Sequence, residues 1–124
     1  MIYKTRYFNR WARKAALSDS ALYHAVAEIR QGLVDTDLGG GIFKKRVALP
    51  GRGKRGSVRT LLATNRNDRW IFVFGFEKNE RANISDKELE ALRLLADDLL
   101  ALTEPQISTA ISNGSLLEVL YETR

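Results

Sequence analysis

The feature that most constrains the fold of this chain is a change in the spacing of its apolar residues. Between residues 42 and 77, apolar and polar side chains alternate in three consecutive segments, which is the two-residue period of β-strands. The segments before and after repeat their apolar residues every three or four positions, as helices do. Short turn-like stretches join the three alternating segments, so they predict an antiparallel three-strand meander. Strands flanked by helices on both sides in sequence indicate an α+β fold.

The N-terminal part is predicted to hold a short strand and two helices. Weak alternation over residues 2–7 favours the strand, and helical spacing begins at Phe8. Ser18 is a suitable N-cap for the second helix, and Gly32 can end it in the left-handed conformation. Residues 35–41 are predicted to be a loop, because three consecutive glycines let the chain reverse. The second helix has an apolar stripe formed by Leu22, Ala25, Val26 and Ile29.

The three central strands are predicted over residues 42–49, 58–65 and 70–77, with a loop at 50–56 and a hairpin turn at 65–68. In the first strand, Lys44 and Arg46 share the face opposite three apolar residues, Phe43, Val47 and Leu49. In the third strand, strict alternation predicts one face formed by Trp70, Phe72, Phe74 and Phe76, and the other formed by Ile71, Val73 and Gly75.

The C-terminal part is predicted to be helical. Ser85 and Glu88 form a capping box that opens a leucine-rich helix. Thr103 opens a shorter helix, and residues 115–121 fit either a final helical turn or an edge strand. No repeat or linker is visible, so we expect a single domain over residues 1–124, with residues 102–124 as a C-terminal helical extension.

Positive charge is concentrated in the first half of the chain. Residues 1–59 carry 13 Lys and Arg against 4 Asp and Glu, whereas residues 60–124 carry 7 against 11. Residues 44–59 hold seven basic side chains and no acidic one: Lys44, Lys45, Arg46, Arg52, Lys54, Arg55 and Arg59. Like charges this close repel one another unless a polyanion neutralises them. We therefore interpret this run as a phosphate-binding surface rather than a solvated loop.

Several classes of chemistry lack the residues they need. The chain has no cysteine, which excludes disulfides, thiolate metal sites and cysteine nucleophiles. Its one histidine, His24, cannot form a multi-histidine metal cage, and its place beside the helical apolar stripe favours a structural role. The acid pair Asp97-Asp98 is typical of a solvated helix face. We therefore predict no metal and no cofactor.

Nucleotide-binding and membrane signatures are also missing. The glycine-rich stretch 51–56 lies between predicted strands and opens no helix, so it does not support a dinucleotide fold. We expect it to be a flexible basic flap over a nucleic-acid backbone. The N-terminus lacks the apolar run of a signal peptide, and no apolar stretch approaches the ~20 residues that span a bilayer. The expectation is a cytoplasmic protein without a membrane partner.

The remaining residues suit the cleavage of RNA without a metal. RNA supplies its own nucleophile, the 2′-hydroxyl, so the protein must mainly stabilise negative charge and exchange protons. Arginine can hold phosphate oxygens with two hydrogen bonds, and a lysine with a lowered pKa can exchange protons. Side chains on strands would give such a site rigidity.

Three runs of sequence resemble a known family: residues 38–48 (Leu-Gly-Gly-Gly-Ile-Phe-Lys-Lys-Arg-Val-Ala), 53–60 (Gly-Lys-Arg-Gly-Ser-Val-Arg-Thr) and 74–81 (Phe-Gly-Phe-Glu-Lys-Asn-Glu-Arg). With the order helix, helix, three-strand meander, helix, they resemble the RelE/ParE toxin superfamily, and within it the HigB-like branch of RelE. The resemblance covers about residues 1–100, and residues 111–119 resemble the end of that branch. It implies a RelE-like fold, with two N-terminal helices packed on an antiparallel sheet and C-terminal helices after the meander.

The resemblance also implies a function. Such toxins cut messenger RNA in the ribosomal A site through 2′-hydroxyl attack, and so inhibit translation. A cognate antitoxin is implied as well, here of the helix-turn-helix kind and encoded by the adjacent gene. The expected partners are thus the antitoxin, messenger RNA and the ribosome.

Site residues are implied position by position. Arg59 matches the phosphate-stabilising arginine, and Lys78 matches a second cationic position. Lys44, Lys45 and Arg46 match the basic strand that holds the RNA, with Lys45 assigned to catalysis. Phe76 matches an aromatic residue that can stack on a base. Glu77 is a candidate base or an ion-pair partner of Lys78, and the flap residues Arg52, Lys54 and Arg55 are assigned to RNA binding.

The chain departs from the family in its proton carriers. Members often use a C-terminal tyrosine or a histidine near the last strand. Here Tyr121 lies in a tail of undecided structure, and no histidine follows residue 24. The identity of the general base and acid therefore stays open.

Two other functions fit parts of the sequence. The first is a ParE-like toxin that binds DNA gyrase without nuclease activity, which would not need Arg59 and Lys78. The second is a module that binds RNA or DNA on its basic sheet without cleaving it.

Overall fold

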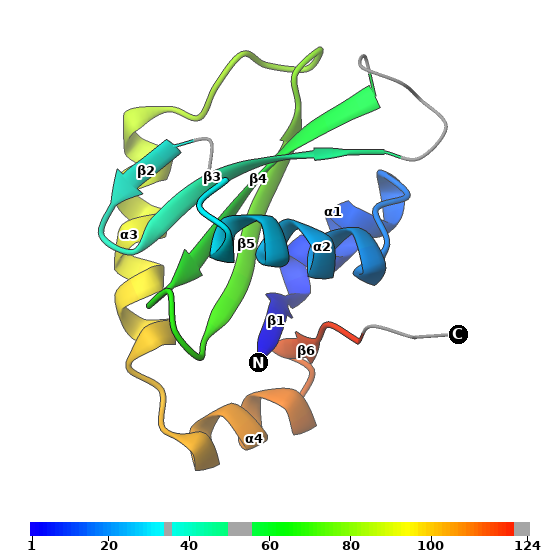
Figure 1. Cartoon of the computed structure of the whole chain (residues 1–124). Coiled ribbons are helices and arrows are strands. Elements are labelled where there is room, and N and C mark those ends of the chain that lie inside the picture. Colours follow the sequence, from blue (N-terminus) through cyan, green and yellow to red (C-terminus); the bar gives the residue numbers. More distant parts are fainter. Residues whose placement is uncertain (34–35, 50–55, 121–124) are drawn as a thin grey trace.

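The computed structural model describes residues 1–33, 36–49 and 56–120, and these form four helices and a six-stranded sheet. In chain order the elements are β1 (Ile2–Thr5), α1 (Arg6–Lys14), α2 (Asp19–Arg30), β2 (Thr36–Gly39), β3 (Ile42–Ala48), β4 (Ser57–Thr64), β5 (Trp70–Glu77), α3 (Asp86–Leu100), α4 (Glu104–Ser112) and β6 (Leu116–Glu118) (Figure 1). The predicted α+β class is confirmed.

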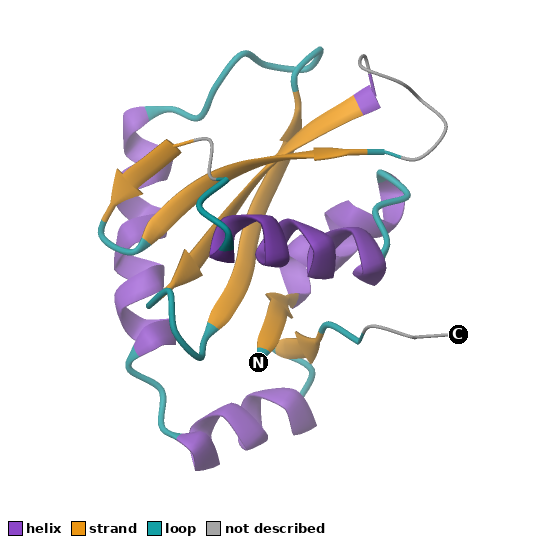
Figure 2. Ribbon diagram, in the orientation of Figure 1, coloured by secondary structure: helices purple, strands orange, loops and turns teal. Residues whose placement is uncertain are grey.

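The sheet has the strand order β2-β3-β4-β5-β1-β6 (Figure 2). β3, β4 and β5 pair antiparallel in succession, whereas β1 runs parallel to β5. β6 then pairs antiparallel with β1, so segments from the two ends of the chain complete one edge of the sheet. The segment at 115–121, which the sequence left open, thus contains an edge strand. The expected C-terminal extension is therefore not helical throughout.

The loop expected at residues 35–41 was wrong for the residues that form β2. Gly39, Gly40 and Gly41 all have positive φ, and together they reverse the chain so tightly that the preceding residues pair with β3. The Asp37 carboxylate accepts a hydrogen bond from the Gly39 amide at 2.9 Å, which fixes the turn. The glycines were recognised as a reversal, but the strand before them has too little apolar alternation to be predicted.

The two faces of the sheet carry separate clusters of buried side chains. We call one the α2 face: its residues pack against α1 and α2, and they include Ile2, Phe43, Val47, Val58, Leu62, Trp70 and Phe72. We call the other the α3 face: its residues pack against α3 and α4, and they include Tyr3, Ile42, Leu61, Ala63, Ile71 and Phe76. The predicted apolar stripe of α2 is confirmed as buried on the first face, and Ser18 caps that helix through a hydrogen bond from Ala21.

One prediction about β5 was wrong, because the strand contains a bulge. Leu62 pairs with Phe72 and Leu61 pairs with Phe74, so Val73 is an extra residue on β5. Trp70 and Phe72 lie on the α2 face, as expected from alternation. Beyond the bulge the alternation is reversed, and Phe74 and Phe76 pack on the α3 face. Strict two-residue alternation cannot anticipate an inserted residue.

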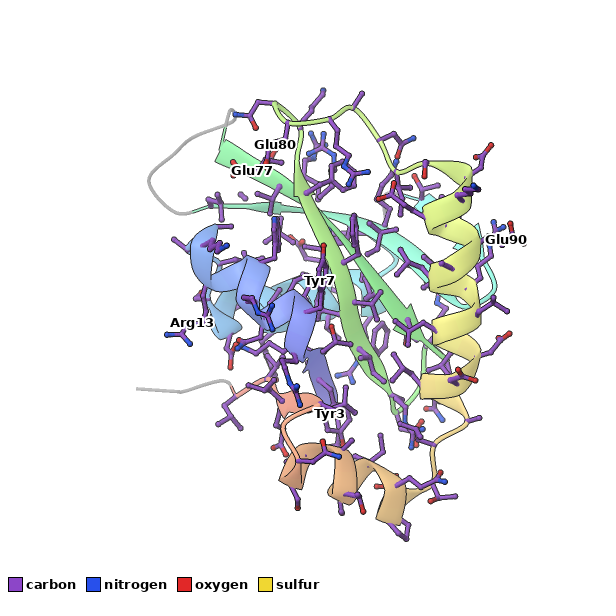
Figure 3. The ribbon with its side chains drawn as sticks, turned by 180° about the vertical axis from the view of Figure 1, so that it is seen from behind. Tyr3, Tyr7, Arg13, Glu77, Glu80 and Glu90 are labelled. Carbon is purple, nitrogen blue, oxygen red and sulfur yellow. The ribbon has the colours of Figure 1, made fainter. Side chains whose placement is uncertain are left out.

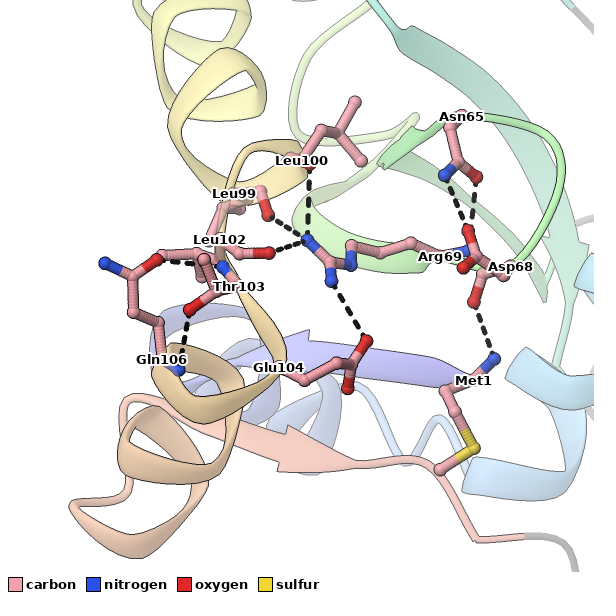
Figure 4. A network of polar contacts seen from close by, with 10 residues as sticks. All are labelled: Met1, Asn65, Asp68, Arg69, Leu99, Leu100, Leu102, Thr103, Glu104 and Gln106. Carbon is pink, nitrogen blue, oxygen red and sulfur yellow. Dashed lines mark hydrogen bonds and ion pairs between the residues drawn. The ribbon is translucent and has the colours of Figure 1, made fainter.

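Arg69 fastens the end of α3 to the hairpin between β4 and β5 (Figure 4). Its guanidinium donates hydrogen bonds to the carbonyl oxygens of Leu99, Leu100 and Leu102, and it pairs with Glu104 at 3.4 Å. Leu99 and Leu100 lie in the last turn of α3, where carbonyl groups lack the donors of a following helical turn, and that turn holds no basic residue. Arg69 therefore supplies from the sheet the positive charge that the helix end lacks.

The capping predictions for the two C-terminal helices are confirmed. Ser85 and Glu88 form the capping box of α3, and Thr103 and Gln106 form one for α4. Within the described ranges, no helix combines the length and the apolar character needed to cross a membrane.

Candidate nucleic-acid interface

Three of the predicted site residues lie together on the α3 face. β3 places Lys44 and Arg46 there, on the same side as Ile42, and β4 places Arg59 there with Leu61. Arg46 and Arg59 stand directly opposite each other in the strand register. We call Lys44, Arg46 and Arg59 the cationic patch.

The cationic patch brings like charges close together. Cβ atoms of directly opposed residues on neighbouring antiparallel strands lie about 4.5–5.5 Å apart, and like charges in such pairs destabilise a sheet. Arg59 is half-buried, and Nη1 of its guanidinium is 3.4 Å from the neutral hydroxyl of Ser57. Among the residues described, neither Lys44 nor Arg59 forms an ion pair with a carboxylate. An arrangement of this kind favours the binding of an anion between the two strands.

Two aromatic rings of β5 lie beside the patch. Phe76 stands opposite Arg59 in the register, and its ring centroid lies 6.4 Å from that of Phe74. The bulge at Val73 is what turns both rings toward the α3 face. Phe76 is only 3% exposed and belongs to the buried cluster of the α3 face, so its ring is not open to a base, whereas Phe74 is partly exposed.

Arg81 covers these two rings. Its guanidinium carbon lies 5.4 Å from the ring centre of Phe74 and 5.8 Å from that of Phe76. The same guanidinium is 2.6 Å from a carboxylate oxygen of Glu88, in the first turn of α3. This hydrogen bond, with those that Glu88 makes with Ser85, whose amide donates to the carboxylate, lowers the pKa of Glu88 to about 2, and the bond to Glu88 raises the pKa of Arg81. Arg81 is therefore held over the aromatic rings as a permanent cation.

Lys45 lies apart from the cationic patch. It is on the α2 face, where its side chain is only 9% exposed and its ammonium is 2.9 Å from Glu28 of α2. Its backbone carbonyl accepts a hydrogen bond from the buried Thr60 hydroxyl at 2.9 Å. The structure therefore places Lys45 in an ion pair between sheet and helix, and not beside Lys44 and Arg46.

The other predicted residues are placed as follows. Glu77 ends β5 (Figure 3). It stands opposite Val58, a residue of the α2 face, so it does not share a face with Phe76. Lys78 is exposed in the turn that follows β5. Arg52, Lys54 and Arg55 lie outside the described residues. His24 is exposed on α2, where its ring is nearly perpendicular to that of Tyr23 with centroids 6.2 Å apart, and it is not part of the patch.

Two residues near the patch were not predicted from the sequence. Arg81 belongs to the run of residues 74–81 that carries the resemblance, but its contact with the rings depends on the bulge. Tyr7 stacks on Phe74, with ring centroids 5.9 Å apart and ring planes 10° apart. No pattern in the sequence relates Tyr7 to Phe74, since it starts a helix far from β5 in the chain.

The described residues contain no group of three or more His, Cys, Asp or Glu side chains that could hold a metal ion. The charged groups of the cationic patch are the side chains of one lysine and two arginines.

A comparison with protein families assigns the chain to one of them. The family described as "RelE toxin of RelE / RelB toxin-antitoxin system" matches residues 1–119. The chain belongs to the RelE toxin family. No curated protein matches the sequence of this toxin closely enough to add to that assignment. Membership in the family gives the protein the role of toxin in a toxin–antitoxin system, and it implies an antitoxin of the RelB type as partner.

Proposed function

We propose that this RelE family toxin is a metal-independent and ribosome-dependent endoribonuclease of the HigB-like branch, which cleaves messenger RNA and so inhibits translation. The observation that carries the proposal is the cross-strand pair of Arg46 and Arg59 on one face of the sheet. Lys44, Phe76 and Arg81 surround that pair. The match to the RelE toxin family supports the same reading, because toxins of this family are generally endoribonucleases.

The proposed reaction uses the 2′-hydroxyl of the RNA as nucleophile. Its oxygen attacks the adjacent phosphorus and its proton passes to solvent water. The bond to the 5′-oxygen of the next nucleotide breaks, and a 2′,3′-cyclic phosphate and a 5′-hydroxyl result. Arg46 and Arg59 would bind the non-bridging oxygens, on which negative charge grows in the transition state. Guanidinium groups held in place increase the rate of cleavage only if their hydrogen bonds to the phosphate are stronger in the transition state than in the bound substrate.

One residue at the surface is a candidate to donate the proton that the leaving oxygen needs. Lys78 is exposed just beyond the strand that bears Phe76, so it can approach the leaving 5′-oxygen and donate a proton to it. Glu77 ends on the opposite face, and we assign it no step. Lys45 is likewise left out of the proposed site because of its ion pair with Glu28.

The proposed cellular partners follow from the family. We propose a helix-turn-helix antitoxin encoded next to the toxin, with messenger RNA in the ribosomal A site as the substrate. Sequencing the adjacent reading frame and co-expressing it with the toxin tests the first part, since the cognate antitoxin restores growth.

Primer extension on messages from cells induced for the toxin tests the nuclease activity. We expect cuts within translated codons for the wild type and their loss in the Arg59→Ala/Lys78→Ala double variant. Lys87→Ala removes one positive charge from an exposed position of α3 and should cut as the wild type does. Growth arrest that persists in the double variant would refute the site.

The two other functions give different results in the same experiment. Intact messages together with broken or relaxed DNA would support a gyrase-binding toxin. Intact messages together with RNA binding in vitro would support a non-catalytic module. Either result excludes the nuclease.

A further inference from the structure

A groove of about 510 Å³ lies between α1 and α3. Its lining is mostly apolar on the β5 and α3 sides, and two arginines of α1 contribute to its α1 side. The lining residues that matter here are Arg6, Tyr7, Arg10, Phe74, Leu92 and Leu95. A volume of several hundred cubic ångströms is the usual size of a site for a small organic group such as a nucleotide.

Tyr7 and Phe74 form an aromatic wall of this groove. β1 pairs with β5 only at residues 70–72, so the part of β5 beyond the bulge has no contact with β1 in the register. α1 follows β1 directly, and Tyr7 in its first turn lies over this part of β5 (Figure 3). Its ring is nearly parallel to that of Phe74, and yet 58% of the residue is exposed. Such a ring has a face available to a further aromatic group.

The two arginines of the groove have different roles. Arg6 donates hydrogen bonds to the carbonyl oxygens of Asn113 and Gly114, both at 3.1 Å, so it fastens α1 to the end of α4. Arg10 is exposed and forms no ion pair with a carboxylate among the residues described. Arg13 and Lys14 extend the positive charge along the same helix, and the first turn of α1 holds no acidic residue. The groove therefore offers a cation that can meet an anionic ligand.

A row of ring contacts on β5 leads from the groove toward the cationic patch. From Tyr7 the contacts run to Phe74 and then to Phe76, which stands opposite Arg59. Residues two apart on a strand are separated by about 7 Å, so the groove and the phosphate site would hold neighbouring parts of one extended ligand. Arg81 spans this path, because it contacts both phenylalanine rings.

We propose that this groove is a base-binding subsite for single-stranded RNA, in which Tyr7 stacks on the base of a nucleotide that flanks the cleaved bond. Arg10 contacts the phosphate of that nucleotide. The inference rests on the proposed function for the position of the cleaved bond, whereas the binding itself can be measured separately. Unpaired bases stacked on aromatic side chains, with arginine on the backbone, are the usual means of binding single-stranded RNA. An acidic amphipathic helix of the antitoxin is the rival occupant. The exposed ring of Tyr7 beside the exposed Arg10 favours RNA, because a base and its own phosphate need a ring and a cation at neighbouring positions.

Binding of a fluorescein-labelled single-stranded RNA of mixed sequence, followed by anisotropy with the full chain, tests the proposal. Tyr7→Ala should weaken binding by about 10- to 100-fold, the range for loss of one stacked base. Tyr7→Phe keeps the ring and should bind within about twofold of the wild type. Tyr23→Ala removes another exposed tyrosine, from α2, and serves as the matched control. With an RNA of the same length that lacks its bases, the wild type and Tyr7→Ala should bind equally.

A second variant tests the subsite without changing the aromatic wall. Arg10→Gln should reduce the slope of log affinity against log salt concentration by about 0.7, the value for one phosphate contact with a single strand. Its fold can be checked by the thermal transition, since an exposed arginine of a helix contributes little to stability.

The outcomes separate the subsite from the proposed function. If Tyr7→Ala binds RNA as the wild type does, or if Tyr7→Phe loses as much affinity as Tyr7→Ala, the subsite is wrong, even if the toxin cleaves messages. If RNA binding is unchanged and antitoxin binding is lost, the groove is a protein-docking site and the inference is overturned. If the toxin cleaves no message but RNA binding depends on the Tyr7 ring, the nuclease proposal fails and the subsite stands.

Discussion

The two faces of the sheet differ in the surroundings of their basic residues. On the α2 face, the two lysines carried by strands are buried and each is paired with a carboxylate of α2: Lys4 with Asp19 at 2.6 Å, and Lys45 with Glu28 at 2.9 Å. On the α3 face, Arg46 and Arg59 stand opposite each other in the register. A lysine that is buried with a carboxylate partner, as on the α2 face, contributes to packing and stability. Two arginines that stand opposite each other, as on the α3 face, instead favour the binding of an anion.

Because of this difference, three neighbouring basic residues that look equivalent in the sequence have different surroundings in the structure. Lys44, Lys45 and Arg46 are consecutive, but the pleat of β3 sends the middle one to the other face. Variants on the α3 face should therefore change activity, and variants on the α2 face should change stability.

The largest effect, a loss of message cleavage, is expected when an acidic residue replaces one of the arginines of the cationic patch. Arg59→Glu places a carboxylate opposite Arg46, as on the α2 face, so message cleavage should fall by at least about 10²–10³-fold. The free energy of unfolding should rise by about 0.2–1 kcal/mol, since an opposite-charge pair replaces a like-charge pair. Cleavage rates on translated messages and urea denaturation measure the two quantities. A variant that is less stable and still active would contradict the comparison.

Gly75→Ala should have the next largest effect, on stability. A Cβ at this position of β5 would lie 2.2 Å from a ring carbon of Trp11, so the indole must move. Overpacking of this kind costs about 1–3 kcal/mol, measurable as a lower midpoint of urea denaturation. The double variant Gly75→Ala/Trp11→Leu removes the clashing ring and should recover part of the loss. If it recovers nothing, strain at Gly75 has another origin.

The ion pair of the α2 face should contribute less. Glu28→Gln leaves the buried Lys45 ammonium without its counter-charge, but Glu28 is itself 52% exposed, so water screens the pair. We expect a loss of about 1 kcal/mol in unfolding free energy. Lys45→Met, which replaces the charge by an apolar chain of similar length, should fold and cleave RNA as the wild type does. If the Lys45→Met variant folds but does not cleave RNA, Lys45 has a role in catalysis after all.

The smallest effect is a pH dependence on the α3 face. The pKa of Glu88 is lowered from its ordinary value to about 2 by the hydrogen bond from Arg81, so its pairing stabilises the folded state above about pH 4.5. That contribution is lost as the pH falls from about 4.5 toward 2. Glu88→Gln keeps a hydrogen-bonding side chain in the capping box but has no charge to titrate. The difference in Tm between wild type and variant should shrink from pH 7 to pH 2.5; a constant difference would mean that the pairing contributes nothing.

Local patterns were sufficient to predict most of the elements. The capping box at Ser85 and the buried stripe of α2 follow from interactions within a few residues, and both are present in the structure. The assignment of Lys44 and Arg46 to one face of β3 followed from strand alternation in the same way. These features could be predicted because their causes lie inside a single element.

Features that depend on distant pairing could not be predicted. The bulge at Val73 arises from the register between β4 and β5, and it changes the face on which Phe74 and Phe76 lie. The stacking of Tyr7 on Phe74 depends on that change and on the parallel pairing of β1 with β5. Lys45 was grouped with its neighbours by resemblance, although strand alternation separates it from them. The roles of the cationic patch and of Lys78 stay predictions until variants are measured.

The arginines that precede and follow β5, Arg69 and Arg81, couple the motions of this strand to those of α3. Arg69, before the strand, binds the carbonyl end of α3, and Arg81, after it, binds Glu88 in the first turn of the same helix. The helix is thus joined to one strand at both of its ends. In amide hydrogen exchange, β5 and α3 should open together as one cooperative unit, at a common free energy, and not separately.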